Sequence, residues 1–242
     1  MNYSEFKALI QDSKTAVYRE TLARNRSTIR VKKEGTVLKN LERIFDATLR
    51  ISNEKGFQAM SIRDLSNETG LSTGALYAYF PGKDELLEML QQQGRALAQQ
   101  ILTDRIDAEP HPISKLRTAI KTHLYLSEAM QPWFYFSYME TKNLSGTERE
   151  KAIASELYTE KIFADILKQG QDQGIFTGRD CQLTAGLLKA MLQDWYLKRW
   201  KYATRNVSVE QYSGFVIEFV ETFCLAGEHV GPQEYADVCS TL

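Results

Sequence analysis

The stretch SIRDLSNETGLSTGALYAYFPGKDELLEML, residues 61–90, decides the fold, because its capping residues and glycines divide it into short helices. Ser61, with an acidic residue three positions later, predicts the start of one helix, and Gly70 predicts its end. Ser72 predicts the cap of a second helix, STGALYAYF, which the Pro-Gly pair at 81–82 closes. Two short helices separated by a tight glycine turn are therefore expected.

A longer helix precedes this pair. In residues 36–56, apolar side chains recur at steps of three and four residues. Two short helices joined by a tight turn and buttressed by a longer one form a helix-turn-helix, whose second helix enters the major groove of DNA. That helix has to face outward, which explains its aromatic residues. Leu76 and Phe80 are expected to face the core, while Tyr77 and Tyr79 are expected to face the groove.

This pattern resembles the signature of the TetR (tetracycline-repressor-like) transcriptional regulators over residues 38–90. The matching positions are Gly70, Leu71, Ser72, Leu76, Tyr77, Phe80, Lys83, Leu86 and Leu87. The resemblance implies that Arg63 and Thr73 contact bases or lie near them. It assigns Tyr77, Tyr79 and Lys83 chiefly to phosphate, although Tyr79 stands where histidine is frequent in the family.

Gly74 adds a second reason to expect DNA at this helix, because a residue without a side chain allows the backbone to approach DNA closely. The predicted DNA-binding residues are Arg63, Ser72, Thr73, Gly74, Tyr77, Tyr79 and Lys83. Other interpretations stay open: Arg63 as a solvated helix residue, and Tyr79 as a packing residue. A lysine at the start of a helix opposes the helix dipole, so a phosphate partner explains Lys83 better than its position alone.

Residues 1–34 form a basic N-terminal extension. The first 40 residues hold nine Lys or Arg against four acids, in a chain whose net charge is -1. A basic end on an acidic body suggests contact with a polyanion. The cations nearest the predicted helix-turn-helix are Arg24, Arg26, Arg30, Lys32 and Lys33, which are expected to reach the DNA backbone or the adjacent minor groove. Phe6, Leu9, Ile10 and Val17 form a weak apolar stripe that docks a short helix on the body, unless the extension is a flexible leader.

The fold class expected is all-α. Residues 35–82 form a three-helix DNA-binding domain, and residues 83–242 form a larger helical domain for effector binding and dimerisation, with about nine main helices in all besides the extension. Aromatic side chains crowd two of these helices, and ligand cavities in helical proteins are mostly apolar. The candidate effector-binding residues are Tyr125, Trp133, Phe136, Tyr138, Met191 and Trp195, with ordinary core packing as the alternative for each.

The last two helices are the expected dimer surface. Small residues permit close helix approach at Ala185, Gly186 and Ala190, and phenylalanines repeat every four residues at Phe215, Phe219 and Phe223. Two helices from each subunit then form a four-helix bundle. An intramolecular core stripe would also explain the phenylalanines.

Other classes of protein find little support. His111, His123 and His229 are scattered without metal-ligand spacing, and no nucleophile or phosphate-binding motif is present, so neither an enzyme, a metal nor a cofactor is expected. Cys181, Cys224 and Cys239 are odd in number and far apart, which favours a reducing cytoplasm. No apolar run is long enough to span a membrane, and no signal peptide is recognisable.

The expected function is a sequence-specific, DNA-binding repressor that a small apolar effector releases from its operator. Its expected partners are double-stranded operator DNA, the effector and a second copy of the chain. Lys198, Arg199 and Lys201, near the aromatic residues, are compatible with a fatty-acyl or acyl-CoA effector. The alternative is a DNA-binding interaction protein that acts mainly through a protein partner. An apolar cavity would favour the sensor, and a solid core would favour the partner.

Overall fold

The computed structural model describes residues 1–143 and 146–226. His229 and Cys239 therefore lie outside the described residues, as does the end of the predicted second domain. Within these ranges the chain is helical, apart from turns and one isolated antiparallel bridge between Phe176 and Leu225. The all-α prediction is confirmed.

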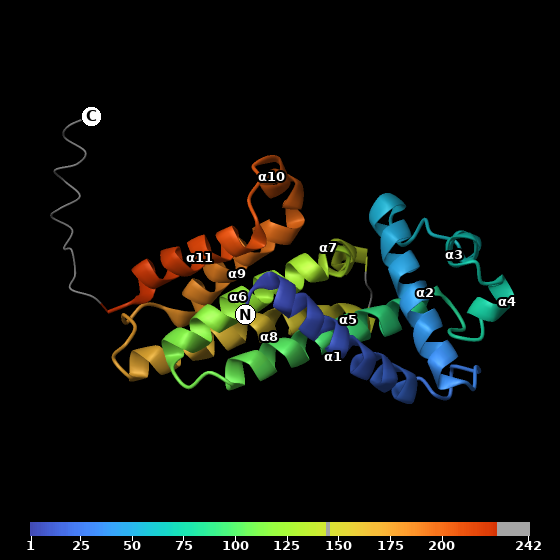
Figure 1. Cartoon of the computed structure of the whole chain (residues 1–242), viewed down its shortest axis with the longest axis horizontal. Helices are drawn as coiled ribbons and strands as arrows, with labels where there is room; N and C mark the ends of the chain where they lie inside the picture. The colour runs from blue at the N-terminus through green and yellow to red at the C-terminus, as the bar shows by residue number, and fades with distance from the viewer. Residues whose placement is uncertain (144–145, 227–242) are drawn as a thin grey trace.

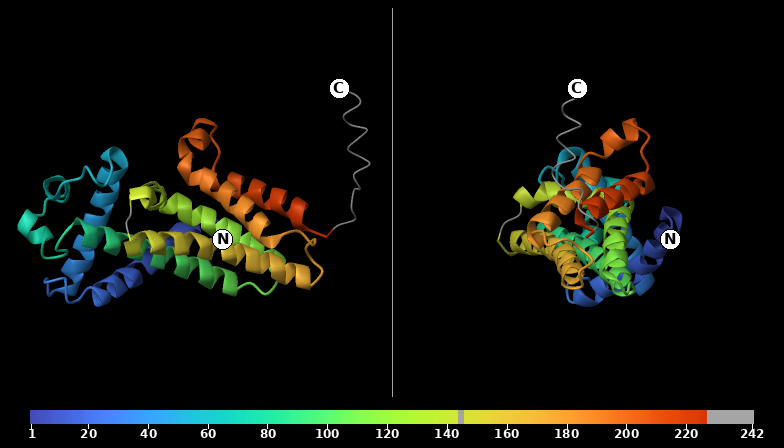
Figure 2. Two further views of the ribbon diagram at one scale, coloured as in Figure 1. Left: turned by 180° about the vertical axis from the view of Figure 1, so that it is seen from behind. Right: turned by 90° about the vertical axis from the view of Figure 1, so that its left-hand side faces the viewer.

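The molecule is elongated, with a small head at one end and a larger helical body (Figures 1 and 2). The head is built from α2 (Glu34–Lys55), α3 (Ile62–Thr69) and α4 (Thr73–Leu76). The body comprises α5 (Lys83–Asp107), α6 (Pro112–Ala129), α7 (Gln131–Glu140), the 3-10 turn η1 (Thr141–Asn143), α8 (Gly146–Asp172), α9 (Cys181–Leu197), α10 (Arg199–Thr204) and α11 (Val209–Cys224). The extension folds as α1 (Tyr3–Arg24).

Two hydrophobic cores underlie this shape, and α5 passes from one to the other. Near its start, Leu86 and Leu90 pack in the head core; further along, Leu97 and Ile101 pack in the body core. Any tilt of α5 therefore changes the position of the head relative to the body.

The extension is part of both cores. Figure 1 shows α1 running obliquely from the middle of the body towards the head. Phe6, Ile10 and Val17 are buried in the body core, while Tyr18 and Leu22 are buried in the head core. The predicted apolar stripe does dock on the body, but as a helix of 22 residues rather than a short one. A flexible leader is excluded for this segment.

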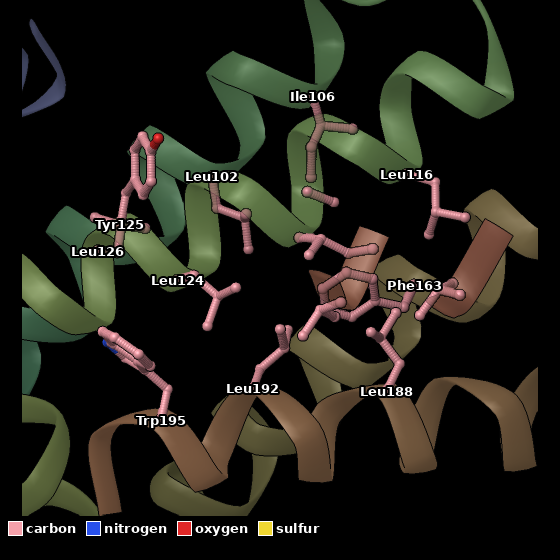
Figure 3. Packing of buried hydrophobic residues seen from close by; sticks show 14 of the residues in the cluster. Leu102, Ile106, Leu116, Leu124, Tyr125, Leu126, Phe163, Leu188, Leu192 and Trp195 are labelled. Carbon is pink, nitrogen blue, oxygen red and sulfur yellow. The ribbon is translucent and has the colours of Figure 1, made fainter. Parts of the chain in front are cut away.

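The body core packs side chains of α9 against those of α6 and α8. Figure 3 shows Leu188, Leu192 and Trp195 rising from α9 towards Leu124 and Phe163. Trp195 is fully buried, and its indole nitrogen donates to a Glu128 carboxylate oxygen at 3.0 Å. This part of the body is a close-packed interior.

Helix α7 ties the body to the head. Trp133 and Phe136 belong to the head core, where the Phe136 ring lies 6.0 Å from that of Phe57. The Phe57 backbone N–H donates to a Glu140 carboxylate oxygen at 3.3 Å. The Asn53 side-chain amide donates to the carbonyl of Pro132 at 3.0 Å. A movement of α7 is therefore transmitted to α2 and to the loop that follows it.

Candidate nucleic-acid interface and effector cavity

The turn between α3 and α4 is built by local hydrogen bonds that the sequence predicts. Ser61 and Asp64 form the expected reciprocal capping box at the start of α3. Gly70 ends the helix at φ 63°, in the left-handed region that glycine adopts without strain. The Ser72 hydroxyl accepts from the Ala75 backbone N–H at 3.1 Å and so caps α4. These bonds fix the angle between the two helices.

Five of the predicted DNA-binding residues share the exposed surface of this unit. Arg63, Ser72, Thr73, Gly74 and Tyr77 are all exposed, whereas Leu76 and Phe80 are completely buried. A Cβ atom added at Gly74 would meet no protein atom within 4 Å. Packing within the chain therefore does not require glycine there, and close approach of another molecule is a separate reason for it.

Tyr79 corrects the prediction that it faces the groove. It is 2% exposed, against 47% for Tyr77, and its hydroxyl accepts a hydrogen bond from the Asn40 side-chain amide at 2.6 Å. The physical reason is a tightening of the chain after Leu76. The backbone N–H of Tyr79 donates to the Leu76 carbonyl at 2.9 Å, a three-residue step that brings the two side chains onto one face.

Lys83 is also placed differently from the prediction. Its ammonium donates to the backbone carbonyls of Phe57 and Gln58, at 2.9 and 3.0 Å, and lies 4.9 Å from the centre of the Phe57 ring. Burial lowers the pKa of this ammonium. The partners of the lysine at the start of α5 are therefore two backbone carbonyls within the chain, and not the predicted phosphate.

Positive charge lies beside α4 because the loop after α1 is anchored there, which the sequence did not predict. The loop after α1 is anchored there by a hydrogen bond from the Arg30 backbone N–H to the Ala78 carbonyl, at 2.8 Å, and by the buried side chain of Ile29. Arg30, Lys32 and Lys33 remain exposed. The predicted basic arm is thus a short anchored loop next to α4.

The two tyrosines give a matched test of this surface. Tyr77→Phe should weaken DNA binding modestly on all sequences and leave the melting temperature unchanged, because an exposed hydroxyl is lost. Tyr79→Phe should instead destabilise the fold by about 1 kcal/mol, because the Asn40 amide loses its acceptor. Thermal melting and DNA titration of both variants check the pair. A direct DNA role for Tyr79 would appear as lost affinity without lost stability.

A cavity of about 850 Å³ lies between α5, α6, α7, α8 and α9. Of the six predicted effector residues, Trp133 and Tyr138 line it. The cavity is within the size range of ligand sites, and its walls are largely apolar.

The other four predicted residues have packing partners instead. The Tyr125 ring lies 5.3 Å from that of Tyr3 and 5.4 Å from that of Phe6. Phe136 packs in the head core, and Trp195 stacks on Tyr212 at 5.0 Å. Met191 is partly buried beside the body core, and its carbonyl accepts from the Tyr212 hydroxyl at 2.8 Å. Tyr125, Phe136, Met191 and Trp195 therefore do not line this cavity, and the packing alternative describes them better.

The cavity also holds charge that the sequence analysis missed. Four cationic side chains line it: Arg95, Lys142, Arg149 and Lys189. Lys189 is buried and pairs with Glu156 at 3.0 Å, and Arg95 lies 3.5 Å from Glu148. One signal was available, since Lys189 interrupts the apolar run LLKAML.

His123 is a neutral group at this cavity. It is buried, and its pKa is held well below the usual value, mainly by burial and also by the charge of Lys189. Its Nδ1 atom has no hydrogen-bond partner among the described residues. Buried polar atoms are normally hydrogen-bonded, so this nitrogen is an available contact for a ligand.

The three lysine and arginine residues expected near the effector are engaged elsewhere. Arg199 forms two hydrogen bonds to the Glu128 carboxylate, at 2.8 and 3.1 Å. Lys198 and Lys201 both pair with Asp194. None of the three lines the cavity.

An apolar stripe runs along α9 and α11, which lie side by side at one edge of the body (Figures 1 and 2). Phe215 and Phe219 are exposed as predicted, and Phe223 is covered in part by the Arg179 guanidinium, 4.0 Å from its ring centre. On α9 the exposed large apolar residues are Leu183 and Leu187. The small residues agree only in part with the expected close approach of helices from two subunits. Ala190 is exposed and Gly186 is half-buried, but Ala185 is fully buried in the body core.

Comparison with known proteins agrees with this architecture. Residues 44–90 match the model of bacterial regulatory proteins of the tetR family, and residues 109–213 match a tetracyclin repressor-like C-terminal domain. The chain belongs to the TetR family and is a DNA-binding transcriptional regulator of that class.

Similar proteins include PksA, an HTH-type transcriptional regulator of Bacillus subtilis, which is 29% identical over 200 residues, covering 77% of this chain and 91% of PksA. The ketosteroid transcriptional regulator KstR2 of Mycobacterium tuberculosis superposes with a TM-score of 0.70 at 18% identity, covering 78% of this chain and 96% of that one. AibR, solved with isovaleryl coenzyme A and operator DNA, gives a TM-score of 0.65 at 18% identity, covering 76% and 97%. These two likenesses concern the fold.

Two further findings concern other classes of protein. Across residues 1–143 and 146–226, no helix is long and apolar enough to cross a membrane. Nor does this part of the chain bring three His, Cys, Asp or Glu side chains together in a way that could hold a metal ion.

Proposed function

We propose that the chain is a homodimeric repressor whose hold on double-stranded operator DNA is released when an amphipathic anion binds the cavity of the body. One observation carries this proposal: α7 belongs to both places. Trp133 lines the cavity and is at the same time part of the head core. A ligand that displaces α7 therefore moves the head, and release requires only that the ligand prefer the displaced state.

The chemistry of the effector follows from the walls of the cavity. An apolar body fits the aromatic and aliphatic side chains, and an anionic group fits Arg95, Lys142, Arg149 and Lys189. A fatty-acyl or acyl-CoA ligand has both parts. The AibR complex with isovaleryl coenzyme A supports this class of ligand. KstR2, a transcriptional repressor that is 26% identical over 165 residues, supports the repressor role. The presence of a cavity favours a ligand sensor over a regulator that acts mainly through a protein partner.

Exposed residues on the head support operator binding. The proposed base contacts are Arg63 and Thr73. The proposed contacts with the DNA backbone are Ser72, Gly74, Tyr77 and the cations of the anchored loop, all of which are exposed. Base contacts would give sequence preference, and phosphate contacts would give orientation. Tyr79 and Lys83 are left out of this set because their polar atoms are engaged within the chain.

A second copy of the chain is the proposed occupant of the stripe on α9 and α11. Leu183, at 70% exposure, and Phe215, at 69%, are large apolar side chains that a soluble chain seldom presents together. Pairing two copies through this stripe forms a four-helix bundle with an isologous interface. Two heads can then reach successive major grooves, which are about 34–36 Å apart.

The cavity is tested with dodecanoyl-CoA and a DNA site selected from random sequence. Dodecanoyl-CoA should weaken operator binding about tenfold or more, and operator should weaken dodecanoyl-CoA binding by the same factor, because coupling between two ligands is reciprocal. Paired replacement of Lys142 and Arg149 by Gln should weaken the acyl-CoA about tenfold and leave operator affinity unchanged in its absence. Calorimetry and fluorescence anisotropy measure the two affinities.

Lys198→Gln is the matched control, since this lysine lies outside the cavity. Its acyl-CoA affinity should equal that of the unaltered protein. If acyl-CoA binds but its affinity does not change with operator, the cavity is not the switch. If acyl-CoA does not bind at all, the proposed ligand class is wrong.

A further inference from the structure

A second cavity, here called the junction cavity, lies where the extension crosses from body to head. Its volume is about 720 Å³, and its walls come from α1, α2, α5 and the start of α7. Tyr18 of α1, Phe45 of α2 and Trp133 of α7 supply aromatic surface. The cavity exists because α1 covers it, and the proposed function makes no use of it.

Two deeply buried polar side chains line the junction cavity without a partner. Tyr18 is 4% exposed and Gln93 is 6% exposed. In the described part of the chain, neither the Tyr18 hydroxyl nor the Gln93 amide forms a hydrogen bond. Buried polar groups are satisfied in nearly all folded proteins, because leaving one unpaired costs about 1–3 kcal/mol. At this cavity the buried Trp133 Nε1 atom is such a group, since it has no partner among the described residues. The Tyr18 hydroxyl and the Gln93 amide are open to the cavity space, so all three are available to a ligand.

The charges at the rim indicate the sign of that ligand. Asp46 and Glu54 line the cavity, and within residues 1–143 and 146–226 neither has an ion-pair partner within 4 Å. The cations at the same rim have other partners. Lys14 pairs with Glu42 at 2.9 Å, Arg50 pairs with Glu68, and the Lys7 ammonium lies 5.3 Å from the Tyr3 ring centre.

We propose that the junction cavity is a second small-molecule site, and that it takes an amphipathic organic cation. The apolar body of the ligand lies against Tyr18, Phe45 and Trp133, and its protonated amine meets the carboxylate of Asp46, with Glu54 nearby. Aromatic walls favour a cation, since the face of a ring attracts positive charge. The Gln93 amide and the Tyr18 hydroxyl supply the remaining hydrogen bonds.

The two cavities therefore differ in the charge that they bind. Both cavities are lined by charges of both signs, and Trp133 lines both. Within the described residues, the body cavity has the cations Lys142 and Arg149 without an ion pair, whereas the junction cavity has two such carboxylates and one such cation, Lys7. A ligand in the junction cavity contacts the head through α2 and the body through α5. A ligand in the junction cavity therefore favours one orientation of the head relative to the body. A ligand in the body cavity shifts the equilibrium between the same orientations.

Asp46 is a favourable position for a test by substitution. Partial burial raises the pKa of its carboxyl, although the charges of Lys14 and Arg50 oppose this and that of Glu42 adds to it. The charged form gains no stability from its surroundings, so Asp46→Asn should fold normally. Glu54→Gln is a second variant at the exposed rim, and Asp12→Asn removes an exposed carboxylate of α1 that does not line the cavity.

The experiment compares two probes that share a naphthalene body but carry opposite charges: propranolol, a secondary amine, and naproxen, a carboxylate. Calorimetry uses the full chain, with melting temperatures recorded without ligand. Propranolol should bind, and Asp46→Asn should weaken it at least tenfold, with a smaller loss in Glu54→Gln. Asp12→Asn and Arg149→Gln should leave its affinity unchanged. Asp46→Asn should not weaken the binding of naproxen, because a carboxylate does not pair with Asp46.

Three results would overturn the proposal. Propranolol that does not bind would exclude the ligand class. Binding that is indifferent to Asp46→Asn and Glu54→Gln would place the ligand elsewhere. Loss of binding in Arg149→Gln would place it in the body cavity. None of these three results depends on whether acyl-CoA releases the protein from DNA. The experiment can therefore contradict this proposal without contradicting the proposed function, and the reverse also holds.

Discussion

Phe6→Ala is expected to lower the free energy of unfolding by about 3–5 kcal/mol, although residue 6 is close to the start of the chain. Phe6 is 1% exposed and packs edge-on against Tyr125 at 5.4 Å, inside the body core. Truncating a ring in a close-packed interior removes its contacts and leaves a cavity. In a chain of this size such a loss lowers the melting temperature by roughly 10 °C.

Lys7→Ala is the control for this variant, because Lys7 is exposed on the next position of the same helix. It should melt within about 2 °C of the unaltered protein. Calorimetric or circular dichroism melting of both variants decides the point. An unchanged melting temperature for Phe6→Ala would mean that α1 is detached from the body in solution.

Replacing both Phe215 and Phe219 by Glu is expected to give a folded monomer with operator affinity reduced about a hundredfold or more. Four carboxylates would face one another across the proposed two-fold axis, and their burial without partners is unfavourable. Each head would then bind its half-site alone and lose the gain from linkage, which is about 10² to 10⁴. Sedimentation and DNA titration measure the two effects.

Tyr158→Glu is the matched control, since Tyr158 is an exposed aromatic residue of α8 that lies outside the stripe and lines neither cavity. It should remain a dimer with full operator affinity. A double variant that stays dimeric would place the interface on another surface. A double variant that loses its helical circular dichroism would mean that the phenylalanines serve the fold of one chain.

The sequence predicted the head well because its signals are local. A serine cap, a left-handed glycine and a proline act within one turn of helix, and the capping box at Ser61 and the end of α3 at Gly70 are found where they were expected. The prediction for Tyr79 was wrong because only one regular helix over STGALYAYF would turn this side chain towards the groove. The α-helical part ends at Leu76, and the tighter turn that follows could not be deduced from the spacing of apolar residues.

The effector cavity was harder to predict, because its residues come from five helices. Trp133 and Trp195 are both aromatic residues in apolar helices, yet one lines the cavity and the other stacks on Tyr212. The choice depends on helix packing angles, which the sequence does not encode locally. The cations of the cavity were missed for the same reason, since no spacing links Arg95 to Lys189.

The span of α1 across both cores has a consequence for protein engineering. A DNA-binding module cut at the start of α2 would be incomplete, because Tyr18, Leu22 and Ile29 complete the head core from upstream. A chimaera joined at residue 35 would leave that side of the transplanted module open. The same helix inserts Phe6 and Val17 into the other module, so a recipient must also accept these side chains. The exchangeable unit in this chain therefore includes α1, which brings side chains of the body core with it.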